Sequence, residues 1–291
     1  MTPTLSICIP AYNGEGFLGQ AIESALAQDF AGFELVIGDD GSTDRTVDLA
    51  RSYRDARVRV LAFEENLGLA GNWNRTIQAC RGAYIKYLAQ DDLLCAGALQ
   101  SFAEATTRFP NQGFFFCANE QIDGRGNHLR WRQPPSRPGV QSPSQLVAML
   151  FVHGNQVGGP TNTLVRPEVF SEVGWFDPRC KYALDWVMWL QIAHRYGGVY
   201  LHDHLVRIRE HEGSETRRLS KLDTTWDDGI EALRVLRQRE PALHWWLNYA
   251  RARQLAGLPR YAVRLMLVEG VLPLPALRHA RNLLRGGLWY W

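Results

Sequence analysis

The stretch that decides the fold runs from residue 6 to residue 46 and reads SICIPAYNGEGFLGQAIESALAQDFAGFELVIGDDGSTDRT. It opens with a short β-rich run and then carries apolar residues three and four positions apart, the spacing of one helical face. That stripe comprises Phe17, Ala21, Ile22, Ala25 and Leu26. A second β-rich run follows at residues 33–38. The order strand, helix, strand predicts two parallel strands with a helix packed across them.

The same alternation continues through the first half of the chain. We expect strands at Leu5–Pro10, Phe33–Gly38, Arg57–Phe63, Ala83–Ala89 and Gly113–Asn119. Helices are expected between them at Glu15–Gln28, Thr43–Arg54, Leu69–Cys80 and Leu94–Arg108, with another at about Leu184–Tyr196. Two further strands, Gly198–His202 and Leu205–Arg209, should complete the core. The pattern predicts an α/β fold with a mostly parallel central sheet, helices on both faces and a C-terminal helical extension.

Composition excludes several classes of protein. The chain has 291 residues, of which 46% are hydrophobic and 21% charged, as in ordinary globular proteins. Its net charge of +2 indicates no nucleic-acid partner. Five cysteines without a CxxC pair indicate neither a zinc site nor a disulfide framework. Neither a signal peptide nor an 18-residue apolar run is apparent, so we expect a cytoplasmic protein, or one peripheral at the inner face of the membrane.

The C-terminal tail differs from the rest in charge. Residues 241–291 contain seven arginines and one acidic residue, Glu269, and end in GGLWYW. A basic amphipathic helix with terminal aromatic residues is typical of an anchor on an anionic membrane surface. Packing of the tail on the catalytic domain, or on a second subunit of a homo-oligomer, explains the same pattern. The sequence leaves all three open.

Polar residues follow the first two predicted strands. Tyr12 and Asn13 come after the first, and Asp39 and Asp40 after the second. Ligands of open α/β sheets bind at the carboxyl ends of the strands. A carboxylate there can accept a hydrogen bond from the imide N–H of uracil or thymine, while Tyr12 stacks on the base. The residues 42–44 also fit a helix cap, which is the plainer interpretation.

A third polar cluster follows the fourth predicted strand. Gln90, Asp91 and Asp92 would lie at the same edge of the sheet as the other two clusters. Carboxylate oxygens are the ligands of hard cations, so the cluster predicts Mg²⁺ or Mn²⁺ with positions left for water and phosphate oxygens.

Taken together, these segments resemble a known family. The run over residues 6–46, followed by ENLGLAGNWN, YIKYLAQDD and NTLVRPEVFSEVGWFDPRCKYALDWVMWLQIA, is similar to the family 2 glycosyltransferases, the inverting GT-A class. The resemblance covers residues 4–215 in the correct order. It implies a GT-A domain at 1–215, with a nucleotide- and metal-binding half at 1–119 and an acceptor half at 120–215. Residues 216–291 would form the helical extension.

The resemblance also implies roles for the clusters. Asp40 would contact the base in a pocket lined by Pro10, Ala11 and Tyr12. Asp92, assisted by Asp91, would hold the metal that bridges the two phosphates. His211 resembles a late family motif that closes over the metal and the diphosphate. The remaining nucleotide contacts would come from Asn13, Asp39, Asn72 and Gln90.

Asp185 occupies the place of the family's catalytic base, eleven residues after Gly174. A carboxylate there would deprotonate the acceptor hydroxyl as it attacks the anomeric carbon. A first-turn acid that favours the helix dipole is the simpler explanation of Asp185, and both can hold. The sequence departs from the family pattern where Trp73 stands before Asn74, which leaves no phosphate role assigned to Arg75.

Three tryptophans follow in the same segment. Trp175, Trp186 and Trp189 would form an acceptor wall against a sugar face, although the helical spacing of Trp186 and Trp189 fits core packing equally well.

The sequence therefore predicts a metal-dependent, inverting glycosyltransferase. It would move a sugar from a UDP- or dTDP-sugar donor to a hydroxyl of a glycan or lipid-linked acceptor in surface polysaccharide synthesis. A sugar-nucleotide pyrophosphorylase is the alternative enzyme, but it needs a glycine-rich basic loop after the first strand, and PAYNGEG contains no basic residue. A non-catalytic nucleotide-sugar-binding module is the third reading, and it predicts loss of Asp92 or Asp185, both of which are present.

Overall fold

The computed structural model describes residues 4–214 and 225–243, together with residues 217, 219 and 246. The chain divides into two compact units, residues 1–229 and 230–291. Most of the C-terminal tail, and with it the predicted membrane anchor, lies outside the described residues. Within the described part, no helix is long and apolar enough to cross a membrane.

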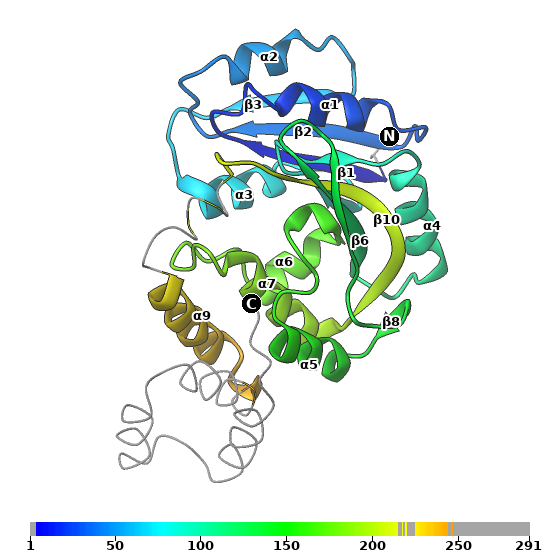
Figure 1. Cartoon of the computed structure of the whole chain (residues 1–291), viewed down its shortest axis with the longest axis vertical. Helices are drawn as coiled ribbons and strands as arrows, with labels where there is room; N and C mark the ends of the chain where they lie inside the picture. Colours follow the sequence, from blue (N-terminus) through cyan, green and yellow to red (C-terminus); the bar gives the residue numbers. More distant parts are fainter. Residues whose placement is uncertain (1–3, 215–216, 218, 220–224, 244–245, 247–291) are drawn as a thin grey trace. The chain divides into compact units, whose positions relative to one another are not determined.

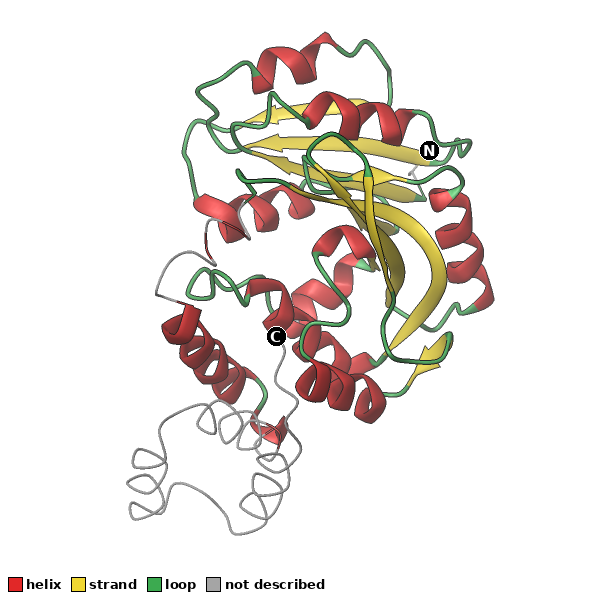
Figure 2. Ribbon diagram, in the orientation of Figure 1, coloured by secondary structure: helices red, strands yellow, loops and turns green. Residues whose placement is uncertain are grey.

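The first unit is built on one mixed sheet (Figures 1 and 2), whose strands follow the order β3-β2-β1-β4-β9-β6-β10-β5. Strands β7 and β8 pair with β6 and β10 respectively. The strands are β1 (Leu5–Ala11), β2 (Phe33–Asp39), β3 (Val58–Ala62), β4 (Tyr84–Tyr87), β5 (Leu93–Leu94), β6 (Phe114–Asp123), β7 (His128–Arg132), β8 (Gly139–Gln141), β9 (Thr163–Val165) and β10 (Gly198–Glu210). The predicted α/β class is confirmed, and all five predicted first-half strands are present.

Helices cover both faces of the parallel part of the sheet. In Figure 1, α1 and α2 lie on one side of β1–β3, and α3 lies on the other. The helices are α1 (Leu18–Leu26), α2 (Thr46–Ser52), α3 (Gly68–Gln78), α4 (Ala98–Arg108), α5 (Pro143–His153), α6 (Pro167–Val173), α7 (Leu184–Tyr196) and α9 (Thr225–Arg239), with 3₁₀ turns η1 (Pro160–Asn162) and η2 (Pro241–Leu243). The stripe on α1 is buried as its spacing predicts, with Ala21, Ile22 and Ala25 fully enclosed.

The two halves of the sheet differ in strand direction. Strands β1, β2, β3 and β4 pair in parallel, whereas β9 runs antiparallel to both β4 and β6. Two predicted strands near residue 200 form the single long strand β10, because irregularities between Leu201 and Val206 bend it without ending it. The proline- and serine-rich segment 130–144 contains the end of β7 and all of β8. Parallel strands β1, β2 and β4 therefore end at one edge, where the site lies.

Candidate active site

Three strands deliver the polar clusters to a common edge. In the parallel pairing, Ala11 at the end of β1 lies beside Asp39 at the end of β2. The next residue, Asp40, donates its N–H to the carbonyl of Ala11 at 2.9 Å. Strand β4 flanks β1 on its other side, so the segment Gln90–Asp92 follows at the same edge. The predicted meeting of the three clusters is observed.

Tyr12 and Gln90 tie the first and third clusters together. The Tyr12 N–H donates to Gln90 Oε1 at 2.9 Å, and Gln90 Nε2 donates to the Tyr12 carbonyl at 3.1 Å. Gly14 is needed beside this pair, because a Cβ there would lie 2.2 Å from Gln90 Oε1. The Tyr12 side chain remains 46% exposed, which leaves its ring free to stack on a planar ligand.

Asn13 ties the first cluster to the second. Its backbone has φ +46°, the left-handed conformation that asparagine tolerates better than most residues. Its N–H donates to Ser42 Oγ at 2.8 Å, and its side-chain oxygen accepts from the Thr43 N–H at 2.9 Å. Asn13 therefore holds this edge of the sheet in place through hydrogen bonds within the protein.

The two carboxylates after β2 have different partners. Asp39 accepts hydrogen bonds from the N–H groups of Gly41 and Ser42, at 3.1 and 2.9 Å, which stabilises the turn. Asp40 is 2% exposed and accepts from the Leu67 N–H at 3.0 Å and from the guanidinium of Arg75. Burial raises the pKa of Asp40 although Arg75 opposes the shift.

Arg75 is a residue that sequence reasoning left without a role. Its guanidinium carbon lies 3.7 Å from the centre of the Phe63 ring while it pairs with Asp40. It therefore lies at the predicted base pocket. The signal available in the sequence was its position one turn after Asn72 on a helix that begins near the end of β3.

Asn72 supports the strands. It is 3% exposed, and its amide donates to the carbonyls of Ala11 and Gly38, at 3.1 and 3.0 Å. Both donated bonds end on the backbone of β1 and β2, so the Asn72 amide N–H groups are used within the protein, and its nucleotide contact stays a prediction. The residue holds the ends of the two strands together.

Asp91 and Asp92 point in different directions. Asp92 is 6% exposed, and its two oxygens accept from Thr161 Oγ1 at 2.6 Å and from the Arg209 N–H at 2.9 Å. Burial, with the negative charge of Asp91, raises the pKa of Asp92 to about 8. Asp91 is only partly buried and lies 3.0 Å from His211 Nε2. The sequence paired His211 with Asp92, whereas the structure pairs it with Asp91, because Thr161 and Arg209 hold Asp92 inward.

These residues suit a divalent ion that is completed by its substrate. Across residues 4–214 and the other described positions, no three His, Cys, Asp or Glu side chains gather as a metal cage. Mg²⁺ is ordinarily held by one or two carboxylates together with substrate phosphates and water. Asp91, with His211 beside it, matches that incomplete donor set. Strand β10 brings His211 there from 120 residues away, and the Phe17 ring, 4.6 Å from it, buttresses the imidazole.

Two buried side chains beneath the acids escaped the sequence analysis. Thr161, in η1, accepts from the Ala89 N–H at 2.9 Å and donates to Asp92. Lys86, fully buried, donates to the carbonyl of Thr161 and to that of Tyr87, the latter at 2.8 Å. Burial lowers the pKa of Lys86 to about 8. Together they fix the turn that carries the carboxylates.

Asp185 lies in the first turn of α7. Its oxygens accept from Asn155 Nδ2 at 2.9 Å and from the Trp186 N–H at 2.7 Å. Burial raises its pKa to about 6, although these hydrogen bonds and the nearby Arg132 act the other way. A carboxylate with such a pKa is ionised at neutral pH and basic enough to take a proton from a hydroxyl in a transition state.

The turn before Asp185 is held by a carboxylate from α9. Asp228 accepts the N–H groups of Lys181 and Ala183 at 2.6 and 2.7 Å. Ala183 is the residue at which α7 begins. Asp228 therefore fixes the backbone immediately before the candidate base.

Tyr87 is influenced by acids of both halves. It is 4% exposed, and burial, followed by the charges of nearby groups, raises its pKa well above the usual value. Those groups include Asp91, Asp92 and Asp185. The candidate base on α7 and the candidate metal-binding turn after β4 therefore both act electrostatically on this phenol.

The predicted acceptor wall is largely core. Trp189 is 1% exposed and donates its indole N–H to the Gly158 carbonyl at 2.8 Å, which favours core packing, the second of the two roles predicted for it. Trp186 is half-buried and donates to the Leu150 carbonyl at 3.1 Å. Trp175 stacks on Phe170 with ring centres 5.9 Å apart. The helical spacing of Trp186 and Trp189 reflects packing against α5 and its following loop.

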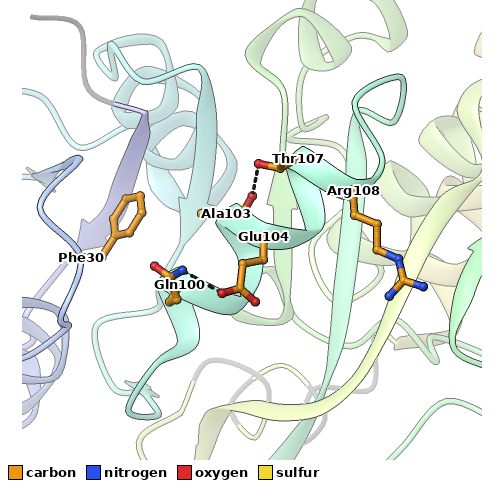
Figure 3. Close-up of a pocket in the computed structure, with 6 residues that line it drawn as sticks. All are labelled: Phe30, Gln100, Ala103, Glu104, Thr107 and Arg108. Carbon is orange, nitrogen blue, oxygen red and sulfur yellow. Dashed lines mark hydrogen bonds between the residues drawn. The ribbon is translucent and has the colours of Figure 1, made fainter.

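A shallow pocket on the outer side of α4 is separate from these residues. Figure 3 shows its lining, which comprises Phe30, Gln100, Ala103, Glu104, Thr107 and Arg108. Glu104 accepts a hydrogen bond from Gln100 at 2.8 Å, and Thr107 donates to the Ala103 carbonyl. None of the six belongs to the clusters at the strand ends.

Comparison with known proteins identifies the family. Residues 6–174 match the profile of Glycosyl transferase family 2, which is more than half of the chain. The chain belongs to glycosyl transferase family 2. The GT-A fold and the glycosyltransferase activity that the sequence predicted are thereby confirmed.

Relatives and solved structures agree with that assignment. A glycosyltransferase of Rickettsia typhi is 29% identical over 80% of this chain and 73% of its own length. TarS of S. aureus, solved in complex with UDP-GlcNAc, has a TM-score of 0.69 at 18% identity over 87% of this chain and 72% of its own. A mannosyltransferase of Pyrobaculum calidifontis, in complex with GDP-Man and Mn²⁺, has a TM-score of 0.57 at 18% identity, covering 97% and 84%. This family 2 enzyme thus shares the fold of proteins that bind nucleotide-sugars.

Proposed function

We propose that this glycosyltransferase is metal-dependent and inverting, and that it transfers a sugar from a UDP- or dTDP-sugar to a hydroxyl of a glycan or lipid-linked acceptor in surface polysaccharide synthesis. The meeting of the polar clusters at the strand ends carries the proposal, because it brings Asp91, with His211 3.0 Å away, to the edge where Tyr12 and Asp40 lie. Asp185, whose charge acts with those of Asp91 and Asp92 on Tyr87, supplies the base that a displacement at a sugar carbon requires. The UDP-GlcNAc complex of TarS and the Mn²⁺ complex of the mannosyltransferase support such a donor and such an ion.

In the donor half, Tyr12 stacks on the base and Asp40 accepts its imide N–H. For that bond Asp40 would use the oxygen lone pairs that are not occupied by the Leu67 N–H and the Arg75 guanidinium. Asp91, with His211, holds the divalent ion, and Asp92 keeps the turn in place. When bound, that ion neutralises the charge that develops on the departing diphosphate.

In the acceptor half, Asp185 takes the proton of the acceptor hydroxyl. The hydroxyl oxygen forms a bond to the anomeric carbon as the bond from that carbon to the phosphate oxygen breaks, and the nucleoside diphosphate leaves with the electron pair. One displacement inverts the configuration and needs one base. Asn155 orients the Asp185 carboxylate for that transfer.

A thermal-shift screen tests the donor. Bound ligand raises the melting temperature by mass action, so UDP-sugars or dTDP-sugars should stabilise the protein more with Mn²⁺ than with EDTA. GDP-sugars serve as the matched control. The anomeric configuration of the transferred sugar, read by NMR, tests inversion. Formation of a nucleotide-sugar from a sugar phosphate would instead reveal a pyrophosphorylase, and binding without transfer to any hydroxyl would leave a binding module.

For the basic tail we propose a peripheral position on the cytoplasmic side of an anionic membrane. Each arginine near such a surface adds about 1 kcal/mol, and salt weakens the attraction. Full-length protein should sediment with anionic liposomes at low salt, and a variant ending at Leu243 should not. A lowered melting temperature, or dissociation on a sizing column, would indicate packing on the catalytic domain or on a second subunit.

A further inference from the structure

Strand β7 carries an exposed aromatic side chain. Its one partner in the sheet is β6, and all five of its residues are exposed. Trp131 is 58% exposed, more than any other large hydrophobic residue of the described part. Exposed strand edges usually carry charges that discourage pairing, and an open tryptophan there commonly marks a binding surface.

Polar rings and an amide border the Trp131 indole. The ring centres of His128 and His204 lie 4.8 and 4.5 Å from it, on strands β7 and β10. Gln133 Nε2 lies 3.4 Å from His204 Nε2. A sugar ring offers a C–H face to an aromatic surface and hydroxyls around its rim to such polar groups. This combination of an apolar platform and a few polar groups matches a carbohydrate better than an apolar protein face.

The neighbouring residue links this surface to the candidate base. Arg132 donates to the carbonyl of Asn155 at 3.4 Å, and the Asn155 amide donates to Asp185. Its positive charge is felt at Asp185, where it favours the ionised carboxyl. Arg130 pairs with Glu210 at 2.5 Å, whereas Arg132, among the described residues, forms no ion pair. Arg132 is exposed and lies near the candidate base, so its guanidinium is suited to bind an anionic group of a substrate.

We propose that β7 is an acceptor-binding strand: Trp131 stacks on a sugar unit of an anionic glycan, and Arg132 binds a carboxylate or phosphate of that glycan near Asp185. The proposal rests on the proposed function, because it takes Asp185 to be the group that activates the acceptor. In this proposal the exposed Trp131, and not the largely buried Trp175, Trp186 and Trp189, is the aromatic side chain that contacts the acceptor. Successive side chains of a strand lie on opposite faces of the sheet, so one acceptor chain reaches both Trp131 and Arg132 by passing round the open edge of β7.

Three oligosaccharides of similar length probe the acceptor class. They are a galacturonic acid hexamer, a phosphodiester-linked mannose hexamer and neutral cellohexaose, each titrated by calorimetry with UDP and Mn²⁺ present. Trp131→Ala should weaken binding of the preferred anionic oligomer by roughly tenfold or more, and Trp131→Phe should restore part of it. Leu129→Ala is the matched control, since Leu129 is 44% exposed on the same strand.

Arg132→Gln separates charge from stacking. It should weaken binding of the anionic oligomers and leave cellohexaose unchanged, and the stronger of the two anionic oligomers identifies carboxylate or phosphate as the partner. Equal binding by parent and Trp131→Ala overturns the proposal, as does a parent that binds none of the three at millimolar concentration. Loss of a dimer in Trp131→Ala without any change in glycan binding also overturns it, because the strand would then join two copies.

UDP binding, measured in the same samples, keeps the two proposals apart. Every β7 variant should bind UDP with Mn²⁺ as the parent does. A parent that binds an anionic glycan through Trp131 but no nucleotide would contradict the proposed donor and leave the glycan site standing.

Discussion

The nucleotide half and the acceptor half of the catalytic unit hold their polar groups differently. In the nucleotide half, hydrogen bonds join the segments that follow the strands. The backbone of Tyr12 bonds the Gln90 side chain, and the Asn13 N–H donates to Ser42. In the acceptor half, Asp185 is fixed by Asn155, while Trp131 and Arg132 stay exposed. A preorganised donor edge suits one constant ligand. An open surface beside a fixed base allows the acceptor to change without disturbing the reaction.

The sharpest way to break this comparison is Asp185→Asn. The amide keeps shape but takes no proton, so we expect turnover to fall roughly 10²–10⁴-fold. UDP affinity, a property of the other half, should stay unchanged in a calorimetric titration.

Asp48→Asn is the control for a purely helical role, because Asp48 is an exposed first-turn acid of α2. A similar small effect of both substitutions on turnover would remove Asp185 from the mechanism.

The tryptophans of the acceptor half should separate into core and surface. Trp189→Ala leaves a cavity and removes the shorter of two hydrogen bonds to the Gly158 carbonyl, so it should lower the free energy of unfolding by about 3–5 kcal/mol. Trp131→Ala should change it by less than about 0.5 kcal/mol. Urea unfolding measures both, and equal losses would mean that Trp131 is packed.

The adjacent acids test the nucleotide half. Asp91→Asn should weaken UDP binding in Mn²⁺ on the order of tenfold or more. Asp92→Asn should weaken it less, because its amide oxygen keeps the bond from the Arg209 N–H and its amide N–H can donate to Thr161 Oγ1 in place of the bond that Thr161 donated. In EDTA the two variants should bind alike. The opposite ranking in Mn²⁺ would restore Asp92 as the metal ligand that the sequence indicated.

The pH dependence tests Asp185 in the unmodified protein. Because the pKa of Asp185 is raised to about 6, kcat/KM should rise about tenfold per unit below pH 6 and level off above it. Between about pH 4 and pH 6 the Asp185 carboxyl is therefore protonated in the folded protein, whereas in the unfolded chain, with an ordinary pKa of about 3.9, it is ionised. Asp185 therefore favours folding at low pH, and that contribution is lost as the pH rises to about 6.

Arg132→Gln sharpens the same profile. Arg132 lowers the pKa of Asp185, so its removal should move the rising limb to higher pH. A profile that is flat between pH 5 and 7, in parent and variant alike, would contradict the assignment of Asp185 as the titrating base.

Sequence reasoning located the strand ends well and side-chain directions poorly. Asp39, Asp40 and Asp91 were found because apolar runs mark where strands stop. The inward turn of Asp92 depends on Thr161 and Arg209, 69 and 117 residues away. No local pattern reports such contacts. The role of Trp189 was left open between acceptor wall and core for a related reason: helical spacing gives a face, and only packing tells whether that face meets solvent.

The hydrogen bonds that Asp228 accepts extend the functional part of the enzyme beyond the catalytic domain predicted at residues 1–215. The family match ends at residue 174, and the resemblance read from the sequence ends near 215, yet the backbone in front of the base is fastened by residue 228. A chimaera that joins this catalytic domain at residue 215 to a relative's C-terminal segment would replace the residue that accepts these hydrogen bonds together with the tail. In this chain, the position of the candidate base therefore depends on a residue that lies beyond the family match.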